Sequence, residues 1–407
     1  MLEFFFYKQP WKAVFITYHF ITTLTIRVPL WLVFSFLPFT RLHPTWTFKR
    51  DFLVRFLKHY LHVASGCGGF RFIPMPTHLA LVEGLNVKGL WVTPTPQLIV
   101  GDVKRWAEKA NVEPIRIPGY WMEQEGSNRE IGEAPRPGEK VVYHIHGGGY
   151  ATHSAHPTNP TANIPRGIMK HSEAVMRTFS IEYRTSSGPP FQEITNPFPA
   201  ALLDAIAGYN YLINVVKFKP EDIIVEGDSA GGNLALALVR YLVENQSQTE
   251  SPNVTIPPPP GELLLFSPWC DIGDSDVRPD TTIYTNRSYD FINLLSKGAH
   301  RSKVNFLGPL GMEGANSNRY ISPASTAPTM EPFSFKGFPR TFIAGGGAEV
   351  LIDQIRQLKN KMVADLGEGQ VEYFEASGAI HDYLVLVWLE PERSETLRRV
   401  ASWIAPH

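Results

Sequence analysis

From residue 141 onward, hydrophobic and polar positions along the chain alternate between two periodicities. Short apolar runs bounded by glycine and proline predict buried strands at residues 141–145, 174–183, 223–226, 263–266, 341–344 and 371–374. Longer stretches with helical spacing occupy residues 200–216, 229–245, 350–366 and 392–404. Strands that alternate with helices predict an α/β fold, with a mostly parallel sheet covered by helices on both faces.

Two parts of the chain do not follow this alternation of strands and helices. Strand-like stretches at 87–93 and 113–117 come before a polar loop at 123–138. Between residues 271 and 323 the pattern gives way to mixed polar and aromatic sequence, which we interpret as an insertion where binding loops belong in open α/β sheets. We therefore expect an N-terminal helical region at 1–80 and an α/β domain at 81–407, with its insertion at about 271–325.

The N-terminal region contains a long apolar run at residues 13–39, interrupted by His19, Arg27 and Pro29. Its length suffices for a membrane-spanning helix of about 20 residues if Arg27 is accommodated. The run starts too late and is too long for a cleaved signal peptide. Three interpretations stay open: a membrane anchor, an interfacial helix pair broken near Pro29, and a hydrophobic cap over the α/β domain. Membrane association is favoured, with the endoplasmic reticulum as one candidate location.

Composition excludes several classes of protein. Lysine and arginine number 38 against 39 acidic residues, so the chain has no general attraction for nucleic acid. The two cysteines, Cys67 and Cys270, are far apart and form neither a disulfide framework nor a metal-binding pattern. Hydrophobic residues make up 43% of the chain, enough for a large core.

One stretch places a serine where a strand turns at once into a helix. Gly227, Asp228, Ser229, Ala230 and Gly231 follow the strand at 223–226 and open the helix at 229–245. Glycines two residues either side of Ser229 allow a strained turn that would expose the hydroxyl above the sheet. The five-residue pattern also occurs in ordinary turns, so it depends on the rest of the chain for support.

A second glycine-rich turn follows the strand at 141–145. His146 is followed by Gly147, Gly148 and Gly149, whose backbone N–H groups can point into a cavity without obstruction by side chains. Such donors stabilise the negative charge that develops on a carbonyl oxygen under nucleophilic attack. We expect the N–H groups of Gly147, Gly148 and Ala230 to form this oxyanion hole. A flexible turn is the alternative, and a phosphate site is disfavoured because no lysine–serine pair follows.

These two motifs, some 80 residues apart, together resemble the hormone-sensitive lipase family of α/β-hydrolases. The resemblance runs from about residue 141 to the C-terminus, and the N-terminal region is similar to that of fungal steryl acetyl hydrolases and secondary-metabolite hydrolases. It implies an α/β-hydrolase fold and hydrolysis of esters by a serine nucleophile, without cofactor or metal. It also implies a role in fungal secondary metabolism.

The serine needs a base and an acid. His381 lies just after the last predicted strand, which suits the chain order serine, acid, histidine of this fold. The resemblance places Glu349 where the family carries its catalytic aspartate, and Asp353, one helical turn later, is the second choice. Asp382 stands where the family usually has glycine, which changes the charge beside the histidine.

The leading hypothesis is a serine esterase, deacetylase-like, acting on hydrophobic small molecules. Tyr150 and Trp269 are the aromatic side chains expected to contact the substrate. An acyltransferase or cyclase with the same nucleophile is the alternative, and exclusion of water decides between the two. A non-catalytic binding scaffold is disfavoured, because it has no need of a strained serine turn.

Overall fold

A computed structural model describes residues 2–68, 76–84, 87–127, 129–190, 192–246 and 255–405. Its centre is an eight-stranded sheet in the order β1-β2-β4-β3-β5-β6-β7-β8. β2 pairs antiparallel with β1 and with β4, and all other neighbours are parallel. The strands are β1 Lys88–Val92, β2 Ile117–Glu123, β3 Lys140–Ile145, β4 Val175–Ile181, β5 Ile223–Asp228, β6 Glu262–Phe266, β7 Arg340–Gly346 and β8 Val371–Ala376.

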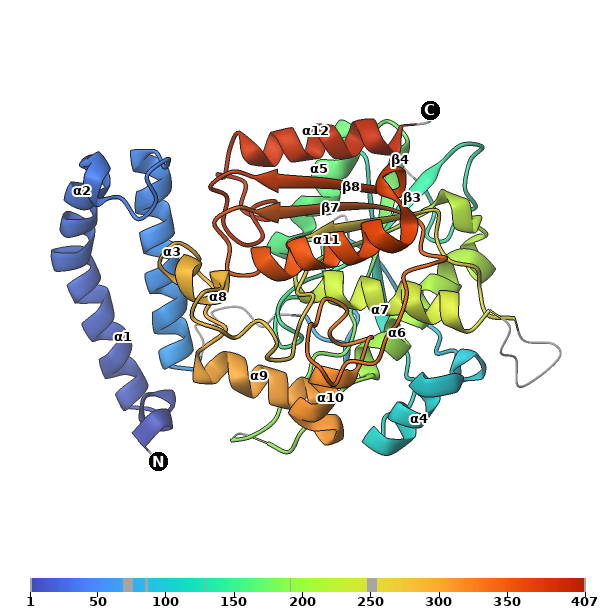
Figure 1. The fold of residues 1–407 in the computed structure, drawn as a ribbon, viewed down its shortest axis with the longest axis horizontal. Helices are drawn as coiled ribbons and strands as arrows, with labels where there is room; N and C mark the ends of the chain where they lie inside the picture. Colours follow the sequence, from blue (N-terminus) through green and yellow to red (C-terminus); the bar gives the residue numbers. More distant parts are fainter. Residues whose placement is uncertain are drawn as a thin grey trace.

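Alternate side chains of the central strands enter two apolar clusters, one on each face of the sheet. In β3, Val141 and Tyr143 belong to one cluster and Val142 to the other. α4, α6, α7 and α11 contribute to the first cluster, and α5 and α12 to the second (Figure 1). The helices are α1 Trp11–Thr22, α2 Val28–Phe36, α3 Phe48–Gly66, α4 Gly101–Ala110, α5 Asn163–His171, α6 Ala200–Asn210, α7 Ala230–Glu244, α8 Thr282–Thr285, α9 Lys297–Leu307, α10 Gly311–Ser317, α11 Ile352–Leu366 and α12 Glu392–Ile404.

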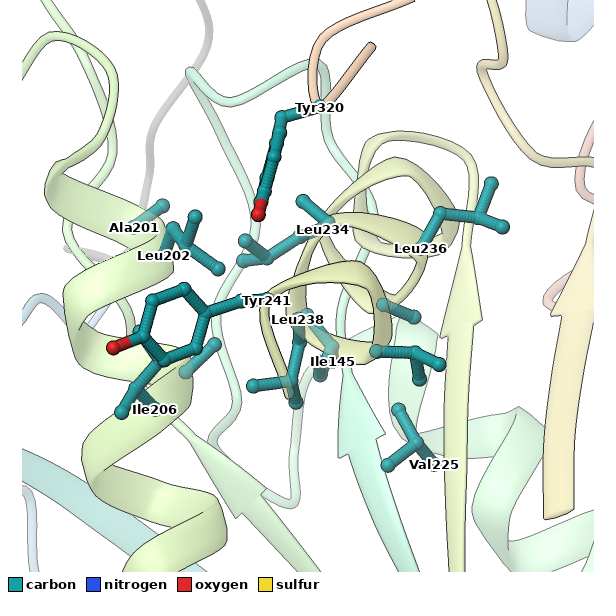
Figure 2. Packing of buried hydrophobic residues seen from close by; sticks show 14 of the residues in the cluster. Ile145, Ala201, Leu202, Ile206, Val225, Leu234, Leu236, Leu238, Tyr241 and Tyr320 are labelled. Carbon is teal, nitrogen blue, oxygen red and sulfur yellow. The ribbon is translucent and has the colours of Figure 1, made fainter. Parts of the chain in front are cut away.

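The helix that follows the serine is deeply embedded. Figure 2 shows α7 packed between α6 and the strands β3 and β5, with Leu234 and Leu238 among the labelled core residues. From Ala230 to Leu242 every residue of α7 is buried. A helix held on all sides fixes the position of its first turn, and this turn carries Ser229.

The N-terminal region contains one helix that is long and apolar enough to cross a membrane. It runs from Trp11 to Phe36 without a break over 26 residues, and its most apolar 18-residue window has a mean hydropathy of 1.3 and is only 6% buried. A π-helical turn at Thr23–Arg27 joins α1 to α2, and Pro29 lies in the first turn of α2, where it needs no N–H partner. One of the three interpretations, an interfacial helix pair broken near Pro29, is therefore wrong.

α3 lies between the apolar helix and the rest of the molecule (Figure 1). The Thr23 hydroxyl is 2.8 Å from His59 Nε2 of α3. Arg27, partly buried, donates a hydrogen bond to the Thr22 hydroxyl. Large side chains such as Leu24 and Val33 stay about half exposed, at 55% and 54%.

Two parts of the sequence-based expectation need correction. The strand expected at 113–117 instead begins at Ile117 and continues through Pro118 to Glu123. Proline is compatible with this position because it is the second residue of the strand, close to the end of the β1–β2 ladder. The region 271–323 contains α8, α9 and α10, whose short apolar patterns are too weak to predict from the sequence.

Candidate active site

Ser229 occupies the turn between β5 and α7 with φ 50° and ψ −118°, a conformation that non-glycine residues rarely adopt. The neighbouring glycines make this turn possible. A Cβ atom at Gly231 would lie 1.9 Å from the carbonyl oxygen of Ile145, and one at Gly227 would lie 2.3 Å from the carbonyl oxygen of Gly231. The predicted elbow is thus required by close backbone packing.

The structure brings three of the expected residues into one hydrogen-bonded chain. His381 Nε2 lies 2.9 Å from Ser229 Oγ, and His381 Nδ1 lies 2.9 Å from Glu349 Oε2. The other Glu349 oxygen accepts the N–H of Gly346 at 2.8 Å. Asp353 does not join them: its carboxylate accepts the N–H of Thr282 at 2.8 Å and pairs with Arg356.

Burial and charge set the pKa values of the acid and the base. Burial raises the pKa of Glu349 to about 6, although its hydrogen bond to His381 works in the opposite direction. Burial lowers the pKa of His381, but the carboxylates of Asp382 and Glu349 outweigh it and hold that pKa well above the ordinary value. The Glu349 carboxylate is fully buried, so its partnership with the imidazole is its main compensation.

Asp382 is part of this site. One of its carboxylate oxygens lies 3.2 Å from His381 Nε2, the nitrogen that also meets Ser229. Asp382 has φ 49°, and its N–H donates to the Ser267 hydroxyl at 3.2 Å. Glycine would fit this left-handed backbone more easily, so the aspartate brings a negative charge to a position that does not favour it sterically.

The oxyanion loop differs from expectation at one position. The Gly147 N–H donates to Asp228 Oδ1 at 2.9 Å, so it is already used and is not available to an oxyanion. Within the described ranges, the N–H groups of Gly148, Gly149 and Ala230 have no hydrogen-bond acceptor. The structure therefore corrects Gly147 from a donor to an anchor of the loop.

Tyr150 and Trp269 are both buried beside the loop and the elbow. The Tyr150 hydroxyl donates to Asn233 Oδ1 at 2.7 Å, and its ring stacks on Phe306 with centroids 3.9 Å apart. Tyr150 thus supports the loop from within the core, which corrects its expected role in contacting substrate. The backbone N–H of Trp269 donates to the Ser229 carbonyl oxygen at 2.9 Å, so this residue helps to hold the elbow. Contact between its ring and substrate stays a prediction.

The same site contains a buried acid that the sequence pattern does not indicate. Asp290, from the insertion, accepts the N–H of Val350 at 2.9 Å and that of His381 at 3.3 Å. Burial raises the pKa of Asp290, while the charge of His381 lowers it. Its only sequence signal is an acidic residue in a segment of mixed polarity, which does not reveal a contact with residues 60 and 91 positions away.

Among the described residues, one buried set has the chemistry of metal ligands: His144, Glu226 and Asp228, with ligand atoms within 4.8 Å of one another. His144 Nδ1 and Glu226 Oε2 are 2.5 Å apart, on adjacent strands. Asp228 already accepts the Gly147 N–H. These contacts describe an internal polar cluster beneath the elbow, and the proposed reaction does not need it to bind an ion.

A cavity of about 870 Å³ lies between the insertion, the loop around Pro189 and the first N-terminal turn. Ser229 and His381 are not among its lining residues, but two contacts connect the lining to residues beside the elbow: the Lys303 ammonium lies 5.9 Å from the centre of the Trp269 ring, and Phe306, next to Asn305 of the lining, stacks on Tyr150. Its apolar lining residues are Phe4, Pro189, Pro190, Ile194, Val277, Leu294, Leu295 and Val304.

The fold agrees with comparisons to known proteins. The family model described as alpha/beta hydrolase fold matches residues 142–385, so the chain belongs to that family. Esterase LipU of Mycobacterium tuberculosis is 25% identical over 283 residues, which cover 68% of this chain and 81% of that protein. An acetyl-hydrolase of Streptomyces hygroscopicus is 27% identical, over 56% of this chain and 62% of that protein. Family and relatives together support a carboxylic ester hydrolase.

Solved structures show the same fold. An esterase/lipase from an uncultured bacterium aligns with a TM-score of 0.54 and 21% identity, covering 92% of this chain and 96% of that one. A hormone-sensitive lipase from a metagenome library aligns with a TM-score of 0.52 and 22% identity, covering 70% of this chain and 81% of that one. The expected α/β-hydrolase fold and the resemblance to this family are confirmed.

Proposed function

We propose that the protein is a serine esterase in which Ser229 is the nucleophile, His381 the general base and Glu349 the orienting acid. The observation that carries the proposal is the unbroken hydrogen-bond chain from Ser229 Oγ through His381 to Glu349. A serine hydroxyl becomes a strong nucleophile only when a base takes its proton, and the imidazole is within reach of that proton.

The reaction proceeds in two halves. Ser229 Oγ attacks the ester carbonyl while its proton passes to His381 Nε2, and the resulting imidazolium is stabilised by Glu349. The oxyanion accepts hydrogen bonds from the N–H groups of Gly148, Gly149 and Ala230. His381 then protonates the leaving alcohol, and water activated by the same imidazole releases the acid and restores Ser229.

We propose a hydrophobic small-molecule ester as the substrate. The cavity between the insertion and the first N-terminal turn supports this, because most of its lining surface is apolar and Lys303 connects it to Trp269 beside the elbow. The relative named acetyl-hydrolase favours a short acyl group, with the bulk of the molecule on the alcohol side. A role in fungal secondary metabolism stays a prediction from the resemblance alone.

We further propose that the Trp11–Phe36 helix holds the enzyme on a membrane. Its 26 residues span about 39 Å at 1.5 Å per residue, enough to cross the hydrocarbon core. Its exposed apolar side chains have no cover in the structure, and exposed apolar surface of this extent is typical of a membrane or protein contact. Phe4, just before this helix, lines the apolar cavity, and we propose that a lipophilic ester approaches the enzyme from this side.

The test is hydrolysis of p-nitrophenyl acetate and p-nitrophenyl decanoate by the full chain in detergent. Ser229→Ala should lose at least about 1,000-fold in kcat, while Ser402→Ala, an exposed serine in α12, should keep wild-type activity. Equal activity of Ser229→Ala and wild type contradicts the mechanism. Transfer of the acyl group to an added alcohol without hydrolysis identifies the acyltransferase alternative.

A further inference from the structure

We propose that the N-terminal helix α3 positions the catalytic residues through Lys58 and Asp290, so that the membrane-side region is a working part of the active site. The inference rests on the proposed esterase function and extends it to the control of triad geometry. Lys58 and Asp290 are positioning residues, because neither touches the reacting atoms.

Asp290 connects the two residues that must act together on Ser229. Its Oδ2 accepts the N–H of Val350, the residue directly after Glu349, and its Oδ1 accepts the N–H of His381 itself. The same Oδ1 accepts the N–H of Phe291 at 2.7 Å, and the side chain is only 1% exposed. One rigid carboxylate thus fixes the main chain next to both the acid and the base.

Lys58 fixes the segment that carries Asp290. From α3, its ammonium group donates to the carbonyl oxygens of Arg287 at 2.9 Å, Ser288 at 2.7 Å and Asp290 at 2.6 Å. An ammonium group has three N–H donors, and here each has an acceptor in the same turn. Burial lowers the pKa of Lys58 to about 8, and the charge of Asp290 works against this change. The group therefore stays mostly protonated at pH 7.

A second contact joins the N-terminal region to the histidine loop. The indole N–H of Trp46, one residue before the N-cap of α3, donates to the carbonyl oxygen of Gly378 at 2.7 Å. Trp46 is 1% exposed, and Gly378 precedes His381 by three residues. The N-terminal region thus holds the loop of the base directly through Trp46, and both triad partners indirectly through Lys58 and Asp290.

This arrangement explains why α3 lies where it does. On one side α3 contacts the apolar helix, through Thr23 and His59 (Figure 1). On the other side it contacts the turn of the insertion that carries Asp290, through Lys58. Deletion of residues 1–80 would remove Trp46 and Lys58 together with the membrane helix. Such a truncation cannot separate membrane binding from catalysis, so point variants of the full chain are the appropriate test.

The experiment compares Lys58→Met with Lys49→Met, an exposed lysine near the start of the same helix. We expect Lys58→Met to lose about 10-fold in kcat on p-nitrophenyl acetate, with KM changed less than about 2-fold, because misplacement affects chemistry more than binding. Lys49→Met should match wild type. Lys58→Arg should recover part of the loss, since a guanidinium group can donate to the same carbonyl oxygens.

Asp290→Asn gives an independent readout. We expect a loss of about 10- to 100-fold in kcat and a shift of the lower pH midpoint of kcat/KM to more acidic values. The midpoint shifts because a negative charge next to His381 is removed, while the carboxylates of Glu349 and Asp382 remain in place; Asp228, whose pKa burial raises well above its ordinary value, is also unchanged. A loss caused only by unfolding would not move this midpoint.

Wild-type kcat and an unshifted midpoint in both Lys58→Met and Asp290→Asn overturn the proposal, as does an equal loss in Lys49→Met. If thermal unfolding shows that either variant is not folded, Trp46→Phe decides with the same kcat and KM measurements, because it removes one hydrogen bond and keeps an aromatic ring. A wild-type chain that neither hydrolyses esters nor reacts with a fluorophosphonate instead refutes the proposed function itself.

Discussion

Asp382 places a carboxylate oxygen 3.2 Å from Nε2 of His381, the same nitrogen that lies 2.9 Å from the Ser229 hydroxyl. A negative charge at this point favours imidazolium over neutral imidazole. Only neutral imidazole can take the serine proton, so Asp382 stabilises the form of the histidine that is inactive as a base. We therefore expect the aspartate to raise the pH at which the site becomes active.

This relationship predicts the effect of Asp382→Asn. Because the pKa of His381 is held well above 6.5, wild-type kcat/KM should rise with pH through a midpoint above that value. Without the Asp382 charge the histidine loses its proton more easily, and the midpoint should fall by about one pH unit or more. The pH profile of p-nitrophenyl acetate hydrolysis measures this directly. An unchanged or higher midpoint would show that Asp382 does not interact with the base.

The choice between two acids is testable with a matched pair. Glu349→Gln removes the charge that orients His381 and should reduce kcat by about 100- to 10,000-fold. Asp353→Asn alters a carboxylate that contacts Thr282 and Arg356 instead, and should stay within about 3-fold of wild type. Steady-state kinetics of the two variants decide the matter, and the reverse order of effects would assign the acid to Asp353.

The anchor of the oxyanion loop gives a prediction for stability. Asp228→Ala leaves the buried Gly147 N–H without an acceptor and should lower the free energy of unfolding by about 1–3 kcal/mol. Asp228→Asn keeps an oxygen acceptor for the Gly147 N–H, so it should cost less. Urea denaturation of both variants gives the comparison. If the asparagine variant is the less stable one, the carboxylate charge and not the hydrogen bond holds the loop.

Membrane binding by the Trp11–Phe36 helix is tested with Leu24→Glu combined with Val33→Glu. Both side chains are exposed on that helix, and two charges in the hydrocarbon core should strongly reduce flotation with phosphatidylcholine vesicles. The control is Leu79→Glu with Val387→Glu, which adds the same charges at exposed apolar positions outside the helix. Equal loss of flotation in both double variants would contradict a specific role of the helix.

The sequence predicted much of this structure because local rules determine the elements involved. The buried strands around Ser229 follow apolar runs, and the glycines of the elbow are required within five residues of the serine. The sequence pattern predicts β2 too early, at 113–117, because Pro118 interrupts the apolar pattern although the strand continues through it. The glycine pattern indicates that this loop supplies backbone N–H donors. It cannot show that the Gly147 N–H is bonded to Asp228, because that residue lies 81 positions away in the chain.

Long-range contacts account for what the sequence does not reveal. Asp290 approaches His381 from the insertion, and Lys58 reaches that insertion from a helix 232 residues earlier. Neither residue belongs to a recognisable pattern, because hydrogen bonds to backbone groups require no particular partner residue. The site therefore contains positioning groups that only the folded chain brings together.

The proposal that Ser229 is the nucleophile is best tested by identifying the residue that reacts covalently. We would treat the full chain with a fluorophosphonate and locate the adduct by mass spectrometry of its peptides, with Ser229→Ala alongside. We expect a single phosphonylated residue, Ser229, in the wild-type protein and no adduct in Ser229→Ala. Labelling at another residue, or no labelling of the folded wild-type protein, would contradict a nucleophilic Ser229 activated by His381.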